Sequence, residues 1–141
     1  MPTLRFTATT RARYEDLAVF ALRLSLALVF IWFGVLKIFG FNPVFDLIAV
    51  VTPALASGAG LAALGVFETA IGLALALNRA RFIIHTLLVL HLLGTFIVFV
   101  TGFDIVFAPY FPVLSLDGEF VVKNAVLVAA GLTVLLHEPR K

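Results

Sequence analysis

The sequence contains no cysteine among its 141 residues. This absence excludes disulfide bonds, thiol redox chemistry, thiolate metal sites and the covalent attachment of a c-type haem. No cofactor is therefore expected to be bound covalently. The two histidines of the third apolar stretch, His85 and His91, are six residues apart and cannot share one face of a helix, and no metal site is predicted.

Charged residues are also scarce, at 13% of the chain, whereas hydrophobic residues make up 62%. Soluble domains have about 45–50% apolar and about 25% charged residues, so this composition predicts an integral membrane protein whose first partner is the lipid bilayer. The length allows a single domain, residues 1–141, without a separate soluble catalytic domain. Although the net charge is +2, the basic residues form no basic face, and nucleic acid is not expected as a partner.

Four long apolar stretches predict an all-α, four-helix transmembrane bundle. The spans are expected at about residues 17–39, 58–77, 82–100 and 120–136. The stretch between the first two spans is apolar, but it is too short to cross a bilayer and is interrupted by Pro43 and Pro53. It predicts a short interfacial or re-entrant helix near residues 44–51, capped by Asn42.

Two other connections have recognisable features. The turn after the second span contains Asn78, which can close a helix, followed by Arg79 and Arg81. The connection at residues 101–119 contains Pro109 and Pro112 and is rich in aromatic residues. We expect it to lie on the membrane surface or dip into it, and to cover one end of the bundle.

The basic residues predict the orientation of the spans. Those outside the spans all fall on one side of a four-span topology: Arg5, Arg11, Arg13, Arg79, Arg81, Arg140 and Lys141. The opposite loops have no lysine or arginine, apart from Lys37 and Lys123 in the adjoining helix ends. The excess of positive charge on cytoplasmic segments predicts that both termini face the cytoplasm.

Glu68 is the single ionisable residue of the second span and lies near its middle. By helix rise it would be more than about 10 Å from water on either side, where a bare carboxylate is costly. Small residues at alternating spacings of four and three draw a groove along the same helix: Gly58, Ala62, Gly65, Thr69, Gly72 and Ala76. Glu68 borders this groove, so we expect it to face another helix that supplies a cation or a hydrogen-bond donor.

Depth along the helices suggests which residues meet. Counted from the cytoplasmic ends, Arg23 lies about 9 Å deep, while Glu68 and His91 both lie about 13 Å deep. We therefore predict a buried polar cluster of these three residues, in which Arg23 pairs with Glu68. Lys37, Lys123 and Asn124 are placed in a second, outer polar layer, where snorkelling to the interface is the alternative for the two lysines.

Three stretches resemble the DoxX-like membrane proteins, over most of residues 20–135: RLSLALVFIWFGVLKIF, then ETAIGLALAL followed by Arg79 and Arg81, and LSLDGEFVVKNAVLVAAGL. The first is also similar to a related family of small inner-membrane proteins of unknown function. The resemblance implies a four-helix bundle in the bacterial inner membrane, in a family named after a subunit of a thiosulfate to quinone oxidoreductase. The positions that match its recurring polar residues are Arg23, Lys37, Glu68, Lys123 and Asn124.

Two functions are compatible with these features. The first is a membrane subunit of an oxidoreductase or redox-stress system, in which Arg23 or His91 hydrogen-bonds a quinone or another apolar ligand and Glu68 orients the donor or relays a proton. A redox partner subunit would then supply the electrons. The second is a non-catalytic membrane scaffold or assembly factor, in which the same ion pairs only fix the bundle. Either protein could form a homo-oligomer.

Overall fold

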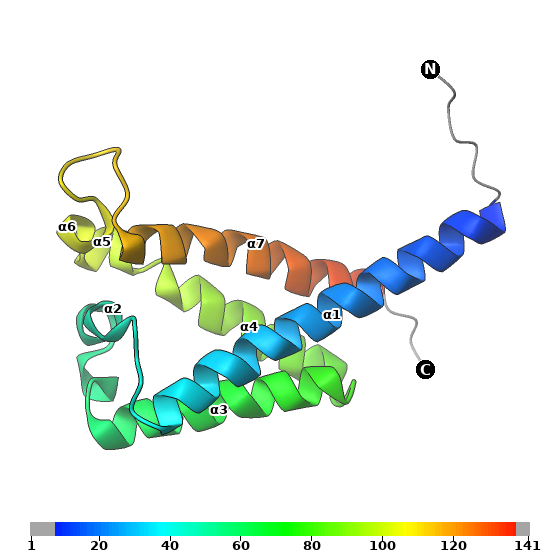
Figure 1. Cartoon of the computed structure of the whole chain (residues 1–141), viewed down its shortest axis with the longest axis horizontal. Coiled ribbons are helices and arrows are strands. Elements are labelled where there is room, and N and C mark those ends of the chain that lie inside the picture. The colour runs from blue at the N-terminus through cyan, green and yellow to red at the C-terminus, as the bar shows by residue number, and fades with distance from the viewer. Residues whose placement is uncertain (1–7, 138–141) are drawn as a thin grey trace.

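The computed structural model describes residues 8–137, and the described residues are almost entirely helical (Figure 1). The four long helices are α1 (Ala8–Ile38), α3 (Gly58–Ala76), α4 (Arg81–Thr95) and α7 (Leu116–His137). The short ones are α2 (Phe45–Val51), the 3-10 helix η1 (Pro53–Leu55), α5 (Val98–Thr101) and α6 (Phe103–Val106). The prediction of an all-α, four-helix bundle is confirmed.

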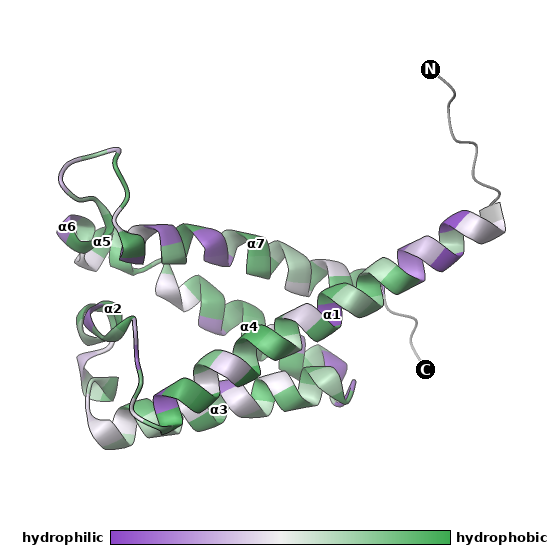
Figure 2. Ribbon diagram, viewed as in Figure 1, coloured by the Kyte–Doolittle hydropathy of each residue, from purple (hydrophilic) through white to green (hydrophobic). Residues whose placement is uncertain are grey.

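Four helical segments in the described part of the chain are long and apolar enough to cross a membrane: Thr9–Ile38, Gly58–Ala76, Arg81–Thr101 and Leu116–His137. Hydrophobic colouring dominates the middle of these segments in Figure 2. Large apolar side chains on their outer faces, such as Leu28, Trp32 and Val126, are more than 60% exposed. Such surface is stable only against lipid, and the chain is a multi-pass membrane protein.

The helices pack as two antiparallel pairs, α1 with α3 and α4 with α7, and α1 also contacts α7. The start of α1, the turn between α3 and α4, and the end of α7 share one end of the bundle (Figure 1). The short helices α2, η1, α5 and α6 gather at the other end. We call these the turn end and the short-helix end.

The first span differs from the prediction at its start. Helix α1 begins at Ala8 and not at residue 17, so Arg11 and Arg13, which were expected outside the span, lie within the helix. At Arg11 the helix carries an exposed ion pair with Glu15, one turn on, which supports it locally. Three of the basic residues that predict the orientation, Arg5, Arg140 and Lys141, lie outside the described residues.

The last span also begins earlier than expected, at Leu116 and not at residue 120. Ser115 explains this start, because its hydroxyl accepts a hydrogen bond from the backbone N–H of Gly118 at 3.0 Å, as an N-cap does. Asp117 and Glu119 in the first turn complement the helix dipole. The expected loop is therefore shorter, and it contains the short helix α6.

The predicted short helix between the first two spans is present as α2. It begins after Val44, and Asn42 accepts only a long hydrogen bond, 3.4 Å, from the N–H of that residue. The apolar side of α2 faces the bundle and contributes to a buried cluster at the short-helix end, made of Val44, Leu47, Val98, Val106 and Val121. The predicted turn residue Asn78 is also confirmed: it has a positive φ of 53° and closes α3 by donating to Leu75 O.

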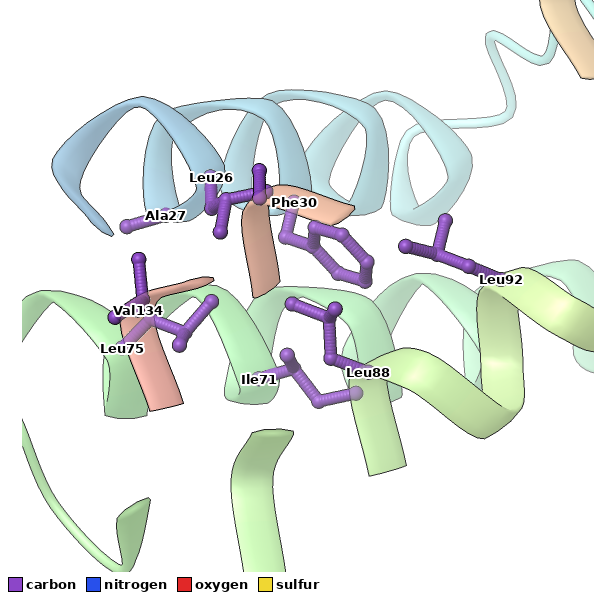
Figure 3. Close-up of a cluster of buried hydrophobic side chains, with 9 residues drawn as sticks. Leu26, Ala27, Phe30, Ile71, Leu75, Leu88, Leu92 and Val134 are labelled. Atoms are coloured by element: carbon purple, nitrogen blue, oxygen red, sulfur yellow. The ribbon is translucent and has the colours of Figure 1, made fainter. Parts of the chain in front are cut away.

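A second apolar cluster fills the bundle nearer the turn end (Figure 3). It takes side chains from all four long helices: Leu26, Ala27, Phe30, Ile71, Leu75, Leu88, Leu92, Ala130 and Val134. Leu88 and Val134 have no exposed surface at all. The two apolar clusters leave between them the level at which the polar residues of the bundle meet.

Small residues set the contact between α1 and α3. A Cβ atom on Gly34 would lie 2.7 Å from the carbonyl oxygen of Gly65, and one on Gly72 would lie 2.8 Å from that of Ala27. Both distances are too short for a carbon atom against a fixed backbone. The groove predicted along the second span is thus the surface on which α1 lies, and its glycines allow the two backbones to touch.

Replacing Gly72 by alanine is therefore expected to lower the stability of the bundle by about 1–3 kcal/mol, because α1 and α3 would have to separate. The matched control is Gly94 of α4, where an added Cβ would have nothing within 4 Å. Gly94→Ala should leave stability unchanged or raise it by up to about 1 kcal/mol, since alanine favours a helix. Unfolding of both variants in mild detergent with added SDS, followed by circular dichroism, tests this. Equal stability of the two would contradict it.

Candidate functional site

Glu68 lies at the centre of the bundle and is bonded to two other helices. Its Oε2 accepts a hydrogen bond from Lys37 Nζ of α1 at 2.7 Å, and its Oε1 lies 3.1 Å from His91 Nε2 of α4. The side chains of Lys37 and Glu68 are 5% and 9% exposed, and that of His91 is 19% exposed. This is a buried charge network across three helices, which is stable only because both carboxylate oxygens have donors.

The direction of side chains in a helix explains why Lys37 reaches Glu68. Side chains tilt toward the N-terminus of their own helix, and α1 and α3 are antiparallel. Gly34 lies against Gly65 and Thr69, which places Lys37 about one turn away from the level of Glu68. Each of the two side chains leans toward the other. Together they are long enough to bridge the offset of about one helical turn between their Cα atoms.

Three of the predicted residue assignments are wrong, those of Arg23, Lys37 and Asn124. Arg23 is buried, as expected, but its Nη1 donates to the carbonyl oxygens of Leu75 and Ala76, at 2.6 and 3.1 Å, and it is not the partner of Glu68. Lys37 does not snorkel to an outer layer, because it is buried and supplies the cation. The physical error was to compare Cα depths alone, without side-chain direction or the register of α1 on α3.

Of the other predicted residues, two lie where the sequence placed them and one does not. His91 belongs to the cluster around Glu68, as predicted. Lys123 is 72% exposed and pairs with Glu119 one turn earlier in α7, as an outer polar residue would. Asn124 is different, because it is buried and donates from Nδ2 to Thr95 Oγ1 at 2.9 Å. Thr95 was not predicted, since a threonine that bonds its own helix gives no signal in the sequence.

These polar groups line a cavity of about 90 Å³, which we call the polar cavity. Lys37, Glu68, His91, Thr95 and Asn124 contribute from all four long helices, and the rest of the lining is apolar and aromatic. It includes Phe30, Phe33, Leu47, Leu64, Phe120 and Leu127. Few converging polar groups in an apolar wall are typical of a small-molecule site.

Aromatic rings hold the polar groups in place. The imidazole of His91 has Phe30 and Phe67 at its edges, with ring centroids 6.0 and 5.7 Å away, in T-shaped arrangements. The ammonium of Lys37 lies 5.9 Å from the centroid of Phe33. The two ring contacts hold His91 in position for its bond to Glu68, and the third holds the ammonium of Lys37.

The other buried histidine is not part of this site. His85 is 1% exposed, and its Nδ1 lies 2.7 Å from the carbonyl oxygen of Arg81 in the same helix. It is on a different face of α4 from His91, as the spacing of six residues predicted. His85 therefore completes the first turn of α4 and takes no part in the polar cavity.

The chemistry available in the polar cavity follows from its donors and acceptors. An ammonium has three N–H donors, and the bond to Glu68 uses one of those of Lys37. Asn124 carries both a donor and an acceptor, and His91 connects the cavity to a carboxylate that can take or give a proton. A ligand with a carbonyl or phenol oxygen would find hydrogen-bond partners here, and a proton could pass along His91 and Glu68.

Comparisons of the chain with protein-family models, with curated proteins and with solved structures find no match.

Proposed function

We propose that the protein binds a quinone, or another apolar ligand with a carbonyl group, in the polar cavity, as the membrane subunit of an oxidoreductase or redox-stress system. The observation that supports this most is the cavity itself, where Lys37, Glu68, His91 and Asn124 converge from four helices within an aromatic wall. A buried polar cluster of this kind is expensive in a membrane protein and typically marks a functional site. The DoxX-like resemblance favours a quinone over other carbonyl compounds.

In this function each polar residue has a separate part. Lys37, His91 and Asn124 form hydrogen bonds with the ligand oxygens, and Glu68 holds Lys37 and His91 in position. His91 and Glu68 relay the protons that accompany reduction or oxidation of the ligand. Because the sequence has no cysteine to hold an iron–sulfur cluster or a c-type haem, a partner subunit would supply the electrons.

The proposed setting is the bacterial inner membrane, with both termini in the cytoplasm. The basic residues of the turn between α3 and α4, Arg79 and Arg81, lie at the same end as the start of α1 and the end of α7 (Figure 1). The short-helix end has acidic residues, including Asp46 and Asp104. The excess of positive charge at the turn end favours its placement on the cytoplasmic side.

Binding of decylubiquinone to the purified protein in lipid nanodiscs tests the function. His91→Phe and Asn124→Leu keep the shape of each side chain and remove a polar group, and each should weaken binding about tenfold, the value of one hydrogen bond of about 1.4 kcal/mol. The matched control is Lys123→Met, next to Asn124 but exposed and outside the cavity lining, which should bind as the natural protein does. Calorimetry or ligand-induced changes in melting temperature provide the affinity.

The alternative function is a membrane scaffold or assembly factor. It is favoured by one specific observation: the Lys37–Glu68 pair ties α1 to α3 at the crossing that Gly34 and Gly65 set, which is what a purely structural pair would do. A scaffold would not bind decylubiquinone. Absence of binding to the natural protein, or equal binding by His91→Phe and Asn124→Leu, would therefore replace the first function by this one.

A further inference from the structure

A second cavity adjoins the polar cavity on the side of α3 and α4. We call it the side cavity. It measures about 280 Å³ and lies between α2, η1, α3 and α4. The two cavities meet at the side chains that line both of them: Leu47, Ile48, Leu64, His91 and Thr95. The lining that belongs to the side cavity alone is mostly aliphatic, with Leu55, Leu90 and Ile97 among its members.

The path of the chain explains why space remains there. Helices α3 and α4 are joined by a tight turn, and they separate toward the short-helix end, where α3 stays with α1 and α4 follows α7 (Figure 1). Helix α2 and η1 occupy the widening gap but do not fill it. Leu90 and Ile97 on the α4 side are 61% and 52% exposed, so this wall continues into the lipid-facing surface.

Gly94 is the second cause of the space. It is the second-last residue of α4, and its φ is not positive, so the backbone at this position does not require glycine. Unlike Gly34 and Gly72, it makes no close backbone contact, because a Cβ atom there would have nothing within 4 Å. The missing side chain thus serves no helix contact, and its effect is to enlarge the side cavity that it lines.

Size links the two cavities. An apolar cavity of about 150 Å³ is known to hold one benzene molecule, so the polar cavity, at about 90 Å³, is small for a six-membered ring. A ring that is hydrogen-bonded to Lys37 or His91 has to extend past the side chains that line both cavities, toward the side cavity. Any tail on that ring then lies against aliphatic side chains and can continue into the bilayer beside Leu90.

We propose that the side cavity binds the hydrocarbon tail of the ligand whose polar head occupies the polar cavity, and that Gly94 determines this specificity by leaving room for the tail. This inference rests on the proposed function. It narrows the ligand to a lipid-like molecule with a carbonyl-bearing head and a long apolar tail, which reaches the site from the bilayer between α3 and α4. Burial of tail methylene groups supplies part of the affinity.

The experiment compares two probes on the same variants in nanodiscs: decylubiquinone and its tailless parent ring, dimethoxymethylbenzoquinone. Gly94→Leu places a side chain in the side cavity and should weaken decylubiquinone binding by about tenfold or more, because two lost methylene contacts suffice for that factor. Binding of the tailless ring should change by less than about twofold. The control is Gly58→Leu, at the exposed start of α3, where an added side chain also meets open space and lines neither cavity.

The possible outcomes separate the two proposals. Unchanged decylubiquinone affinity in Gly94→Leu, with both probes bound by the natural protein, would overturn the tail site and leave the proposed function standing. Failure of the natural protein to bind either probe would overturn the proposed function, and the tail site with it. If Gly94→Leu does not fold, Gly94→Val decides: its branched side chain also enters the side cavity and should give a smaller loss for decylubiquinone alone, and equal affinity for that probe would overturn the tail site.

Discussion

Replacement of Lys37 by methionine is expected to lower the free energy of unfolding by about 3–5 kcal/mol, the cost of leaving one charge of a buried pair uncompensated. The carboxylate of Glu68, whose side chain is 9% exposed in the natural protein, would keep only His91 as a partner. Glu68→Leu should cost a similar amount, because it leaves the ammonium of Lys37 among apolar side chains. The double variant should recover much of the loss, because neither member of the pair is left as an uncompensated buried charge.

Unfolding of the four proteins of this cycle in mild detergent, titrated with SDS, measures the coupling between Lys37 and Glu68. The matched control is the exposed pair of Lys123 and Glu119, with side chains 72% and 51% exposed. Lys123→Met should cost less than about 1 kcal/mol, because water already solvates both charges. If the two single losses at Lys37 and Glu68 simply add, the pair is not coupled and the centre of the site is wrongly assigned.

The cycle also separates structure from function. The double variant should recover stability, but its polar cavity would lack two of its charged groups. A double variant that is stable and still binds decylubiquinone as tightly as the natural protein would show that the pair only fixes α1 on α3. A stable double variant with weakened binding would show that the ligand uses the pair.

The sequence predicts the spans and the burial of Glu68 because both follow from composition. Four apolar stretches require helices in a bilayer, and a carboxylate near the middle of one of them requires a donor from a neighbour. His91 was placed correctly because it lies at the same depth on the following span. The groove of small residues was also correct, and Gly65 and Gly72 do contact α1 closely.

The partner of Glu68 could not be predicted from depth in the membrane, because depth does not specify how α1 is aligned along α3. The contact of Gly34 with Gly65 and Thr69 fixes how α1 lies on α3, and only then do the tilts of Lys37 and Glu68 bring their side chains together. An alignment of α1 on α3 by their small residues, made before the charges are paired, predicts Lys37 as the partner of Glu68. The cavities could not be predicted at all, because they depend on how α2 packs between the ends of α3 and α4.

Arg23 has a role of its own at the turn end of the bundle. Its guanidinium donates to Leu75 O at 2.6 Å and to Ala76 O at 3.1 Å, in the last turn of α3. Carbonyl groups at the end of a helix lack donors within it and carry a partial negative charge. A buried cation there supplies the donors and balances the charge. Arg23 is 6% exposed, and water cannot easily take its place.

Arg23→Met is therefore expected to lower the free energy of unfolding by roughly 3 kcal/mol, since hydrogen bonds to a charged group contribute about 1.5–3 kcal/mol each. Arg23→Lys should recover part of this, because the ammonium keeps the charge but ends one bond short of the position of Nη1, the atom that bonds both carbonyls. The same SDS titration measures both variants. In combination with Glu68→Leu the losses should add, because Arg23 bonds the backbone of α3 and not the carboxylate. A coupling between Arg23 and Glu68 as large as that between Lys37 and Glu68 would reverse this assignment, and full recovery by Arg23→Lys would show that the charge alone matters.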